Sequence, residues 1–69
     1  MMIEWDDGFT IKVNVDKDTV VVSANKEGLH SLAKQLMALA DSDVGSHIHY
    51  DEYNSFESGS NEMIIQKIG

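Results

Sequence analysis

The stretch Asn25–Ala40, NKEGLHSLAKQLMALA, decides the fold, because the spacing of apolar residues changes there from a strand pattern to a helix pattern. Asn25 is a candidate N-cap, and Glu27 lies in the first turn, where the helix dipole favours an acid. Gly28 costs a helix about 1 kcal/mol relative to Ala. Close approach of the helix backbone to a neighbouring strand would explain why Gly occurs at this position. We predict a helix from Lys26 to about Ala40 with one apolar stripe facing the core: Leu29, Leu32, Ala33, Leu36 and Ala40.

Two strands are predicted before this helix. Phe9–Val15 alternates apolar and polar residues, and Thr19–Ala24 contains three consecutive valines, which favour strand. The short polar connection Asp16-Lys17-Asp18 has hairpin length. The two strands should therefore pair as an antiparallel hairpin, with these residues facing the core: Phe9, Ile11, Val13, Val15, Val20, Val22 and Ala24.

Two further strands are predicted after the helix. In Ser46–Tyr53, side chains alternate between faces, so that Ile48 and Tyr50 should face the core. Glu62–Ile68 is apolar on both faces, which suits a central strand or an outer face that a partner covers. The outward residues of the third strand are then His47, His49 and Asp51.

The order ββαββ predicts an α+β fold, with one helix packed on a mainly antiparallel four-stranded sheet and residues 1–69 as a single domain. No second helix is available to cover the other side of that sheet. We therefore expect an open sheet face that mixes polar and apolar side chains, which is typical of an interface.

The charge is strongly acidic, with twelve acidic residues against five basic ones and a net charge of −7. Such a balance opposes binding to nucleic acid or anionic membranes and favours a basic partner, although it also serves solubility alone. The sequence has no Cys and no apolar run near the ~20 residues of a membrane span. Its N-terminus does not have the pattern of a signal peptide, so we expect a cytoplasmic protein.

The cluster of His47, His49 and Asp51 raises the question of a metal site. A structural metal site usually has four ligands. The sequence has no Cys and no other His near this cluster to complete such a set. We therefore expect neither a metal nor another cofactor. Two neighbouring histidines could also make an interface sensitive to pH. Catalysis is not expected, because no nucleophile motif or phosphate-binding glycine loop is present and the small fold offers little room for a pocket.

Several motifs together resemble the immunity protein 32 family of bacterial polymorphic toxin systems, over about Val22 to Lys67. The most specific are Asn25-x-Glu27-Gly28-Leu29 and His47-x-His49-x-Asp51-Glu52-Tyr53-Asn54, supported by SLAKQLMALA in the helix and GSNEMIIQK at Gly59–Lys67. The resemblance implies a small cytosolic α+β protein that binds and neutralises a toxin encoded beside it. It implies no catalytic residues.

We therefore expect a toxin-binding protein rather than an enzyme. Its acidic strand and loop would enter a basic cleft of the toxin, with carboxylates in place of phosphates. Glu62 extends the run of carboxylates in this region. Two alternatives stay open: a homodimer joined through the open sheet face or the edge strand Glu62–Ile68, and a weak His-x-His metal-binding protein. The predicted partner-binding residues are His47, His49, Asp51, Glu52, Tyr53, Asn54 and Glu57.

Overall fold

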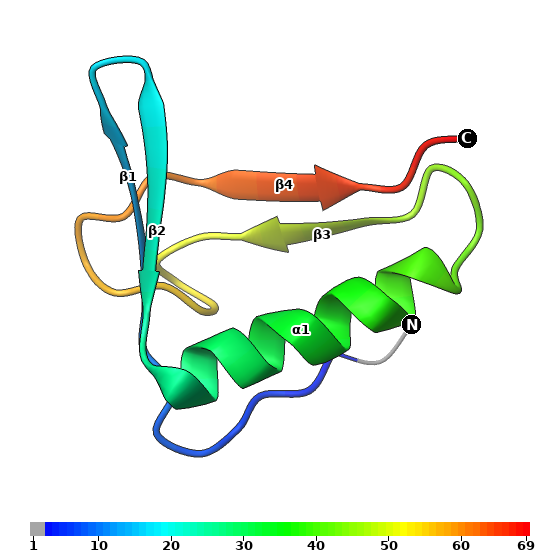
Figure 1. Cartoon of the computed structure of the whole chain (residues 1–69), viewed down its shortest axis with the longest axis horizontal. Coiled ribbons are helices and arrows are strands. Elements are labelled where there is room, and N and C mark those ends of the chain that lie inside the picture. The colour runs from blue at the N-terminus through cyan, green and yellow to red at the C-terminus, as the bar shows by residue number, and fades with distance from the viewer. Residues whose placement is uncertain (1–2) are drawn as a thin grey trace.

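The computed structural model describes residues 3–69 and has the predicted order of elements (Figure 1). The fold is α+β, and no helix among these residues is long and apolar enough to cross a membrane. The elements are β1 (Ile11–Asp16), β2 (Thr19–Ala24), α1 (Lys26–Ala40), β3 (His47–Tyr50) and β4 (Met63–Gln66).

The four strands form two separate antiparallel sheets instead of the single four-stranded sheet predicted from the sequence. One sheet pairs β1 with β2, and the other pairs β3 with β4. Figure 1 shows the two hairpins running in different directions, with α1 below β3 and β4. The described residues therefore do not form the single open sheet face that the sequence predicted. Lys12 and Asn14 lie on one hairpin, whereas His47 and His49 lie on the other.

The predicted start of α1 is confirmed. The Asn25 side chain accepts a 2.8 Å hydrogen bond from the backbone N–H of Gly28, which satisfies a donor that the helix itself cannot pair. The same Oδ1 atom accepts from Thr10 N at 3.0 Å, and Nδ2 donates to Gly8 O at 2.9 Å. Close approach explains Gly28, since a Cβ there would lie 2.5 Å from Thr10 O and 2.9 Å from a side-chain atom of Ile11.

The helix is rotated relative to the predicted orientation. Its buried residues are Gly28, Ser31, Gln35 and Leu39, each one position away from a member of the predicted stripe. One residue corresponds to about 100° around the helix axis. Much of the apolar stripe consequently faces solvent, with Leu29 55% and Leu36 44% exposed; Ala33 and Ala40 are exposed too.

Polar bonds from α1 to the N-terminal segment account for this rotation. Asp6 N donates to Ser31 Oγ at 2.8 Å, and Gln35 Nε2 donates to Glu4 O at 2.8 Å. Lys34 Nζ lies 2.6 Å from Asp6 Oδ1. That hydrogen bond, together with the charge of Asp6, raises the pKa of Lys34. Burying the predicted leucine stripe instead would leave these backbone groups without their partners.

The core lies where the two hairpins and α1 meet. Tyr50 is completely buried, stacks on Phe56 with ring centroids 5.5 Å apart, and meets the edge of Trp5 at 6.2 Å. Trp5 in turn stacks on Phe9 at 4.4 Å. These aromatic contacts join the N-terminal segment, β3 and the loop after β3. The other buried apolar residues are Ile11, Val13, Leu39 and Ile48.

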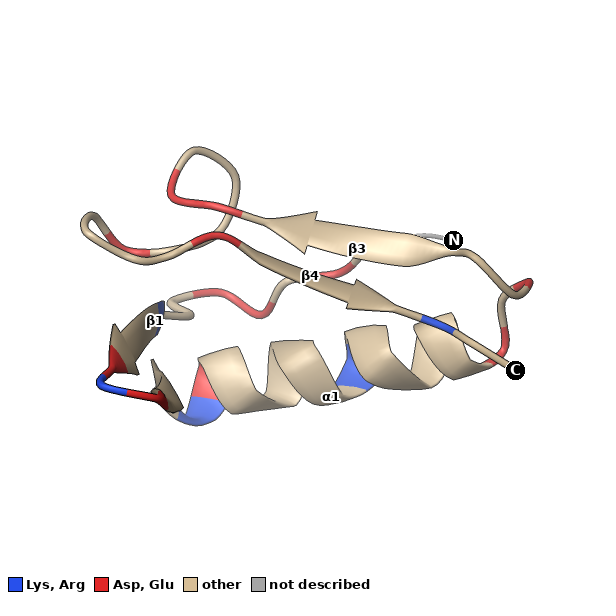
Figure 2. Cartoon of the chain, turned by 90° about the horizontal axis from the view of Figure 1, so that it is seen from above, with Lys and Arg blue, Asp and Glu red and all other residues tan. Residues whose placement is uncertain are grey.

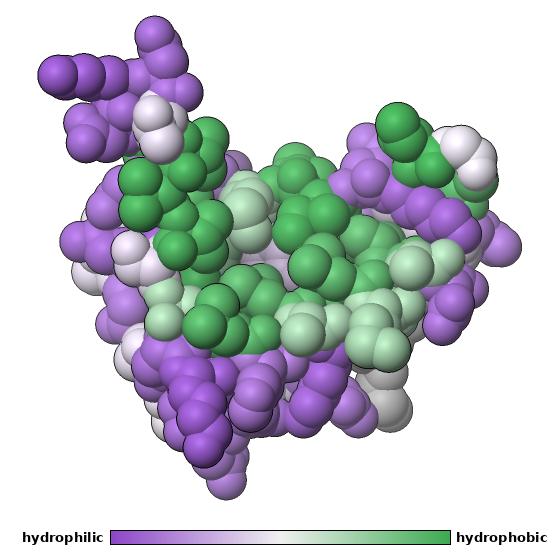
Figure 3. Space-filling model, in the orientation of Figure 1, coloured by the Kyte–Doolittle hydropathy of each residue, from purple (hydrophilic) through white to green (hydrophobic). Residues whose placement is uncertain are grey.

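The β1–β2 hairpin projects beyond this core. Val13 is buried, as predicted, but Val15 is 54%, Val20 62% and Val22 41% exposed, so the expectation that these three face the core is wrong. They share one hairpin face with Val13, as the register pairs Val13 with Val22 and Val15 with Val20. Within residues 3–69, no side chain covers Val15 and Val20 at the far end of that face. Figure 3 shows apolar side chains forming a continuous, hollowed surface over β2, α1 and β4.

Candidate partner-binding surface

The predicted partner-binding residues lie on β3 and in the loop that follows it. The alternation of β3 buries Ile48 and Tyr50 and exposes His47 and His49, as the sequence predicts. The strand ends at Tyr50, three residues earlier than predicted, so Asp51 belongs to a turn and not to the outer face of a strand.

Within residues 3–69, His49 lies near carboxylates and His47 does not. His49 Nε2 lies 3.3 Å from Glu62 Oε2 and 4.0 Å from Asp51 Oδ2. His47, two residues earlier on the same face, pairs across the sheet with Gln66. The described part of the chain contains no group of three or more His, Cys, Asp or Glu side chains arranged to hold a metal ion. His47, His49 and Asp51 therefore do not converge as a ligand set.

Asp51 and Asn54 shape the loop through hydrogen bonds. Asp51 Oδ1 accepts from the backbone N–H groups of Tyr53 and Asn54, both at 3.0 Å. Asn54 Oδ1 accepts from Asp51 N at 3.2 Å, while Asn54 Nδ2 donates to His49 O at 3.1 Å. Asp and Asn favour such turns because their short side chains reach the backbone of nearby residues. Both residues thus hold the loop in shape, whatever else they contact.

Three of the predicted residues are exposed on this loop. Tyr53 is 92% exposed, and Glu57 is exposed as well. Glu52 is also exposed, and its Oε2 accepts from Gly59 N at 2.9 Å across the loop. Between these residues Phe56 is buried against Tyr50, which anchors the middle of the loop to the core.

The end of the loop is bonded to the outer edge of β1. Glu57 N donates to Ile11 O at 2.9 Å, and Asn61 N donates to Val13 O at 2.7 Å. Ser60 Oγ accepts from Val13 N at 3.3 Å. Ser60 and Asn61 were not predicted to matter, and no local pattern could reveal them, because their partners lie far away in the sequence. This attachment gives the loop a defined position on the hairpin.

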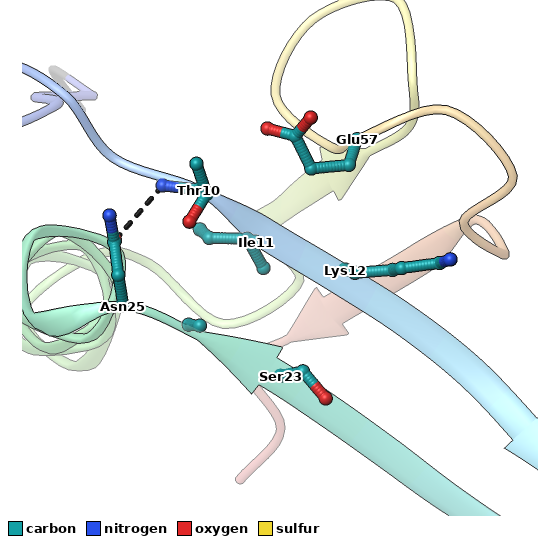
Figure 4. A pocket seen from close by; sticks show the side chains of 7 residues that line it. Thr10, Ile11, Lys12, Ser23, Asn25 and Glu57 are labelled. Atoms are coloured by element: carbon teal, nitrogen blue, oxygen red, sulfur yellow. Dashed lines mark hydrogen bonds between the residues drawn. The ribbon is translucent and has the colours of Figure 1, made fainter.

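An open depression of about 440 Å³ lies beside the start of β1 and the end of β2 (Figure 4). Glu57 and Lys12 both line it, and the backbone N–H of Thr10, another lining residue, donates to Asn25 Oδ1 at 3.0 Å. The charged groups do not converge on a common point in Figure 4. The depression therefore does not present the set of converging groups that binds a small molecule.

The charge of this region is uniformly negative. Residues 44–66 contain four carboxylates and no Lys or Arg. Figure 2 shows these acidic positions on the two loop segments that extend past the ends of β3 and β4. A segment of this kind attracts a cationic surface and repels polyanions. The four carboxylates are Asp51, Glu52, Glu57 and Glu62.

These features describe a small α+β domain that displays a shaped, acidic loop. A model of one protein family, described as Immunity protein 32, matches residues 19–68, which is more than half of the chain. The chain belongs to the immunity protein 32 family. The match begins at β2 and includes α1, both strands of the second hairpin and the loop that joins them. Searches of curated proteins and of solved structures found no match.

Proposed function

We propose that the protein is a cytoplasmic bacterial immunity protein that binds a cognate toxin and neutralises it by occupying a basic surface of that toxin. The acidic loop, defined as Asp51–Glu62, carries the interaction together with His47 and His49. The observation that carries this proposal is the placement of four carboxylates in a cation-free segment that is fixed to both hairpins. Family membership supports the toxin as the partner.

The proposed action is stoichiometric binding, without catalysis or a cofactor. A loop already held in shape loses less conformational entropy on binding than a flexible one, so its carboxylates add more to affinity. Their charge also speeds encounter with a basic partner. Tyr53 is a suitable contact at the centre of such an interface, because Tyr combines a large apolar ring with a polar end.

Co-expression with the toxin encoded beside the gene tests the proposal. Cells should survive with the native protein and lose protection with Glu57→Lys, whose exposed side chain makes no hydrogen bond or ion pair within residues 3–69. The matched control is Asp43→Lys, which changes the net charge equally at an exposed position in the turn after α1. Loss of protection only with Glu57→Lys supports the loop as the binding surface.

Equal protection by both variants would remove Glu57 from the interface. Failure of the native protein to protect cells would overturn the proposed function itself. Asp51→Lys is a poor test, because it would also break the hydrogen bonds that shape the loop.

A further inference from the structure

The two edges of the β1–β2 hairpin differ in whether their backbone groups are hydrogen-bonded to another segment. The outer edge of β1 is covered, since Ile11 O accepts from Glu57 N, Val13 O accepts from Asn61 N, and Val13 N donates to Ser60 Oγ. The sheet ends at β2 on the other side, because β2 pairs with β1 alone. The hairpin therefore has one protected edge and one free edge.

The free edge carries unpaired backbone groups. Val13 directs its N–H and C=O away from β2, so its cross-strand partner Val22 directs its own away from β1. Hydrogen-bonded and non-hydrogen-bonded pairs alternate along an antiparallel ladder, so Val20, two residues before Val22, also directs its N–H and C=O away from β1. Within residues 3–69, neither residue has a hydrogen-bond partner on this side.

This edge also has none of the usual protection against pairing with another strand. Natural edge strands are shortened, bulged or supplied with charged residues or Pro. β2 has six residues, TVVVSA, with no charge and no Pro, and its register with β1 is continuous. Its central side chains are exposed: Val20 by 62%, Val21 by 40% and Val22 by 41%. The edge strand β4 of the other sheet is shorter, with four residues, and follows the exposed Glu62.

We propose that a second copy of this chain occupies the free edge, with β2 pairing antiparallel to β2 of the other copy across a twofold axis. A twofold contact requires a surface that complements itself, and an uncharged strand paired antiparallel with its own copy meets this condition. The net charge of −7 does not oppose the contact locally, because β2 has no charged side chain.

Charge at the ends of β2 favours the antiparallel direction. The turn before β2, Asp16-Lys17-Asp18, has a net charge of −1, whereas Lys26 and Glu27 after its other end cancel. Parallel pairing would place the two negatively charged turns side by side, whereas antiparallel pairing puts them at opposite ends of the contact.

The apolar surface beside β2 supplies the remaining contact area. A standard interface buries about 800 Å² on each partner, more than one strand edge can provide. Val20 and Val22 of β2 and Leu29 and Leu36 of α1 expose apolar side chains. Figure 3 shows an apolar, hollowed surface over these elements. The acidic loop lies at the opposite edge of the hairpin, so the dimer leaves the proposed toxin-binding surface open on both copies.

Sedimentation equilibrium and light scattering of the full chain, over a range of concentrations, test this dimer. The native protein should form a dimer, and Val20→Lys should raise the dimer Kd at least about tenfold, because it places a charge in the paired strands. Val44→Lys is the matched control: Val44 is also 62% exposed, but it lies in the turn after α1, and its variant should dimerise like the native protein.

Hydrogen exchange of the native protein gives a second readout that needs no variant. The amides of Val20 and Val22 should become protected as concentration rises, while exchange at Tyr53 stays unchanged. A monomer at every concentration, rapid exchange at both valines in the dimer, or native-like dimerisation of Val20→Lys would each overturn the proposal. Loss of toxin protection without loss of the dimer would reject the proposed function alone.

Discussion

The hydroxyl of Tyr50 donates a 2.6 Å hydrogen bond to Oε1 of Gln35, and both side chains are buried. This bond joins β3 to α1 inside the core. Gln35 Nε2 continues the connection to Glu4 O in the N-terminal segment. Within residues 3–69, no buried side-chain nitrogen or oxygen is left without a hydrogen-bond partner. The polar centre of the core is therefore fully satisfied, and disturbing it should be costly.

Replacing Tyr50 with Phe should lower the free energy of unfolding by about 1–3 kcal/mol, because Gln35 Oε1 stays buried and loses its donor. Urea denaturation followed by far-UV circular dichroism measures the change. The combined variant Tyr50→Phe with Gln35→Leu should lose less than the sum of the two single changes, since their interaction is counted twice in that sum. Strictly additive losses would contradict an energetic link between these side chains.

Stability should also fall at alkaline pH because of Tyr50. Burial raises the pKa of Tyr50 above its usual value, so the unfolded chain releases this proton at a lower pH than the folded protein. The contribution is fully present below about pH 10, the pKa in the unfolded chain, and is lost as pH rises through the folded pKa. Urea midpoints between neutral and alkaline pH should show this loss, and Tyr50→Phe should show a smaller one.

Gly28→Ala should destabilise the protein, although Ala is the better helix former. A Cβ at this position would come within 2.5 Å of Thr10 O, a backbone atom that cannot move freely. We expect a loss of about 1–3 kcal/mol, typical of overpacking, in thermal or urea unfolding. Ala33→Gly, on the exposed side of α1, is the control and should lose about 1 kcal/mol from helix propensity alone. Stabilisation by Gly28→Ala would show that the hairpin does not pack closely here.

Asp51→Ala should loosen the acidic loop. The change removes the acceptor of two backbone N–H groups, and a net hydrogen bond contributes about 1 kcal/mol. Amide exchange at Tyr53 and Asn54 should speed up, as measured by NMR. Glu57→Ala removes a carboxylate whose side chain bonds to nothing in residues 3–69, so exchange there should match the native protein. Equal behaviour of the two variants would mean that Asp51 does not hold the loop.

Local patterns predicted the bounds of α1, its Asn25 cap and the inward side chains of β3, because each depends on neighbouring residues. The orientation of α1 was predicted incorrectly. Hydrophobic periodicity favours burying Leu29 and Leu36, but the helix instead turns Ser31 and Gln35 inward to bond the N-terminal segment. The two partners are separated by 25 positions of sequence in the first bond and by 31 in the second. No short window of sequence therefore contains both partners.

The same limit applies to the sheet and to the candidate site. Strand identities and faces follow from alternation, but whether two hairpins merge into one sheet depends on how they pack. Here the covered edge of β1 is bonded to Glu57 and Asn61 of the loop instead of another strand. The predicted site residues do lie together on β3 and the loop after it. The sequence did not show which of them hold the loop in shape and which are exposed, because this depends on their hydrogen bonds and burial in the folded protein. Asp51 and Asn54 turned out to be bonded inward, and Tyr53 and Glu57 outward-facing.

The attachment of Ser60 to Val13, across 47 positions of sequence, has a consequence for folding. Contacts between distant residues form slowly, because a long loop of chain must first close. The last part of the acidic loop can adopt its final position only after the chain from Val13 to Ser60 has been synthesised. A newly made molecule should therefore gain its completed surface late, in the same step that closes the first hairpin against the second.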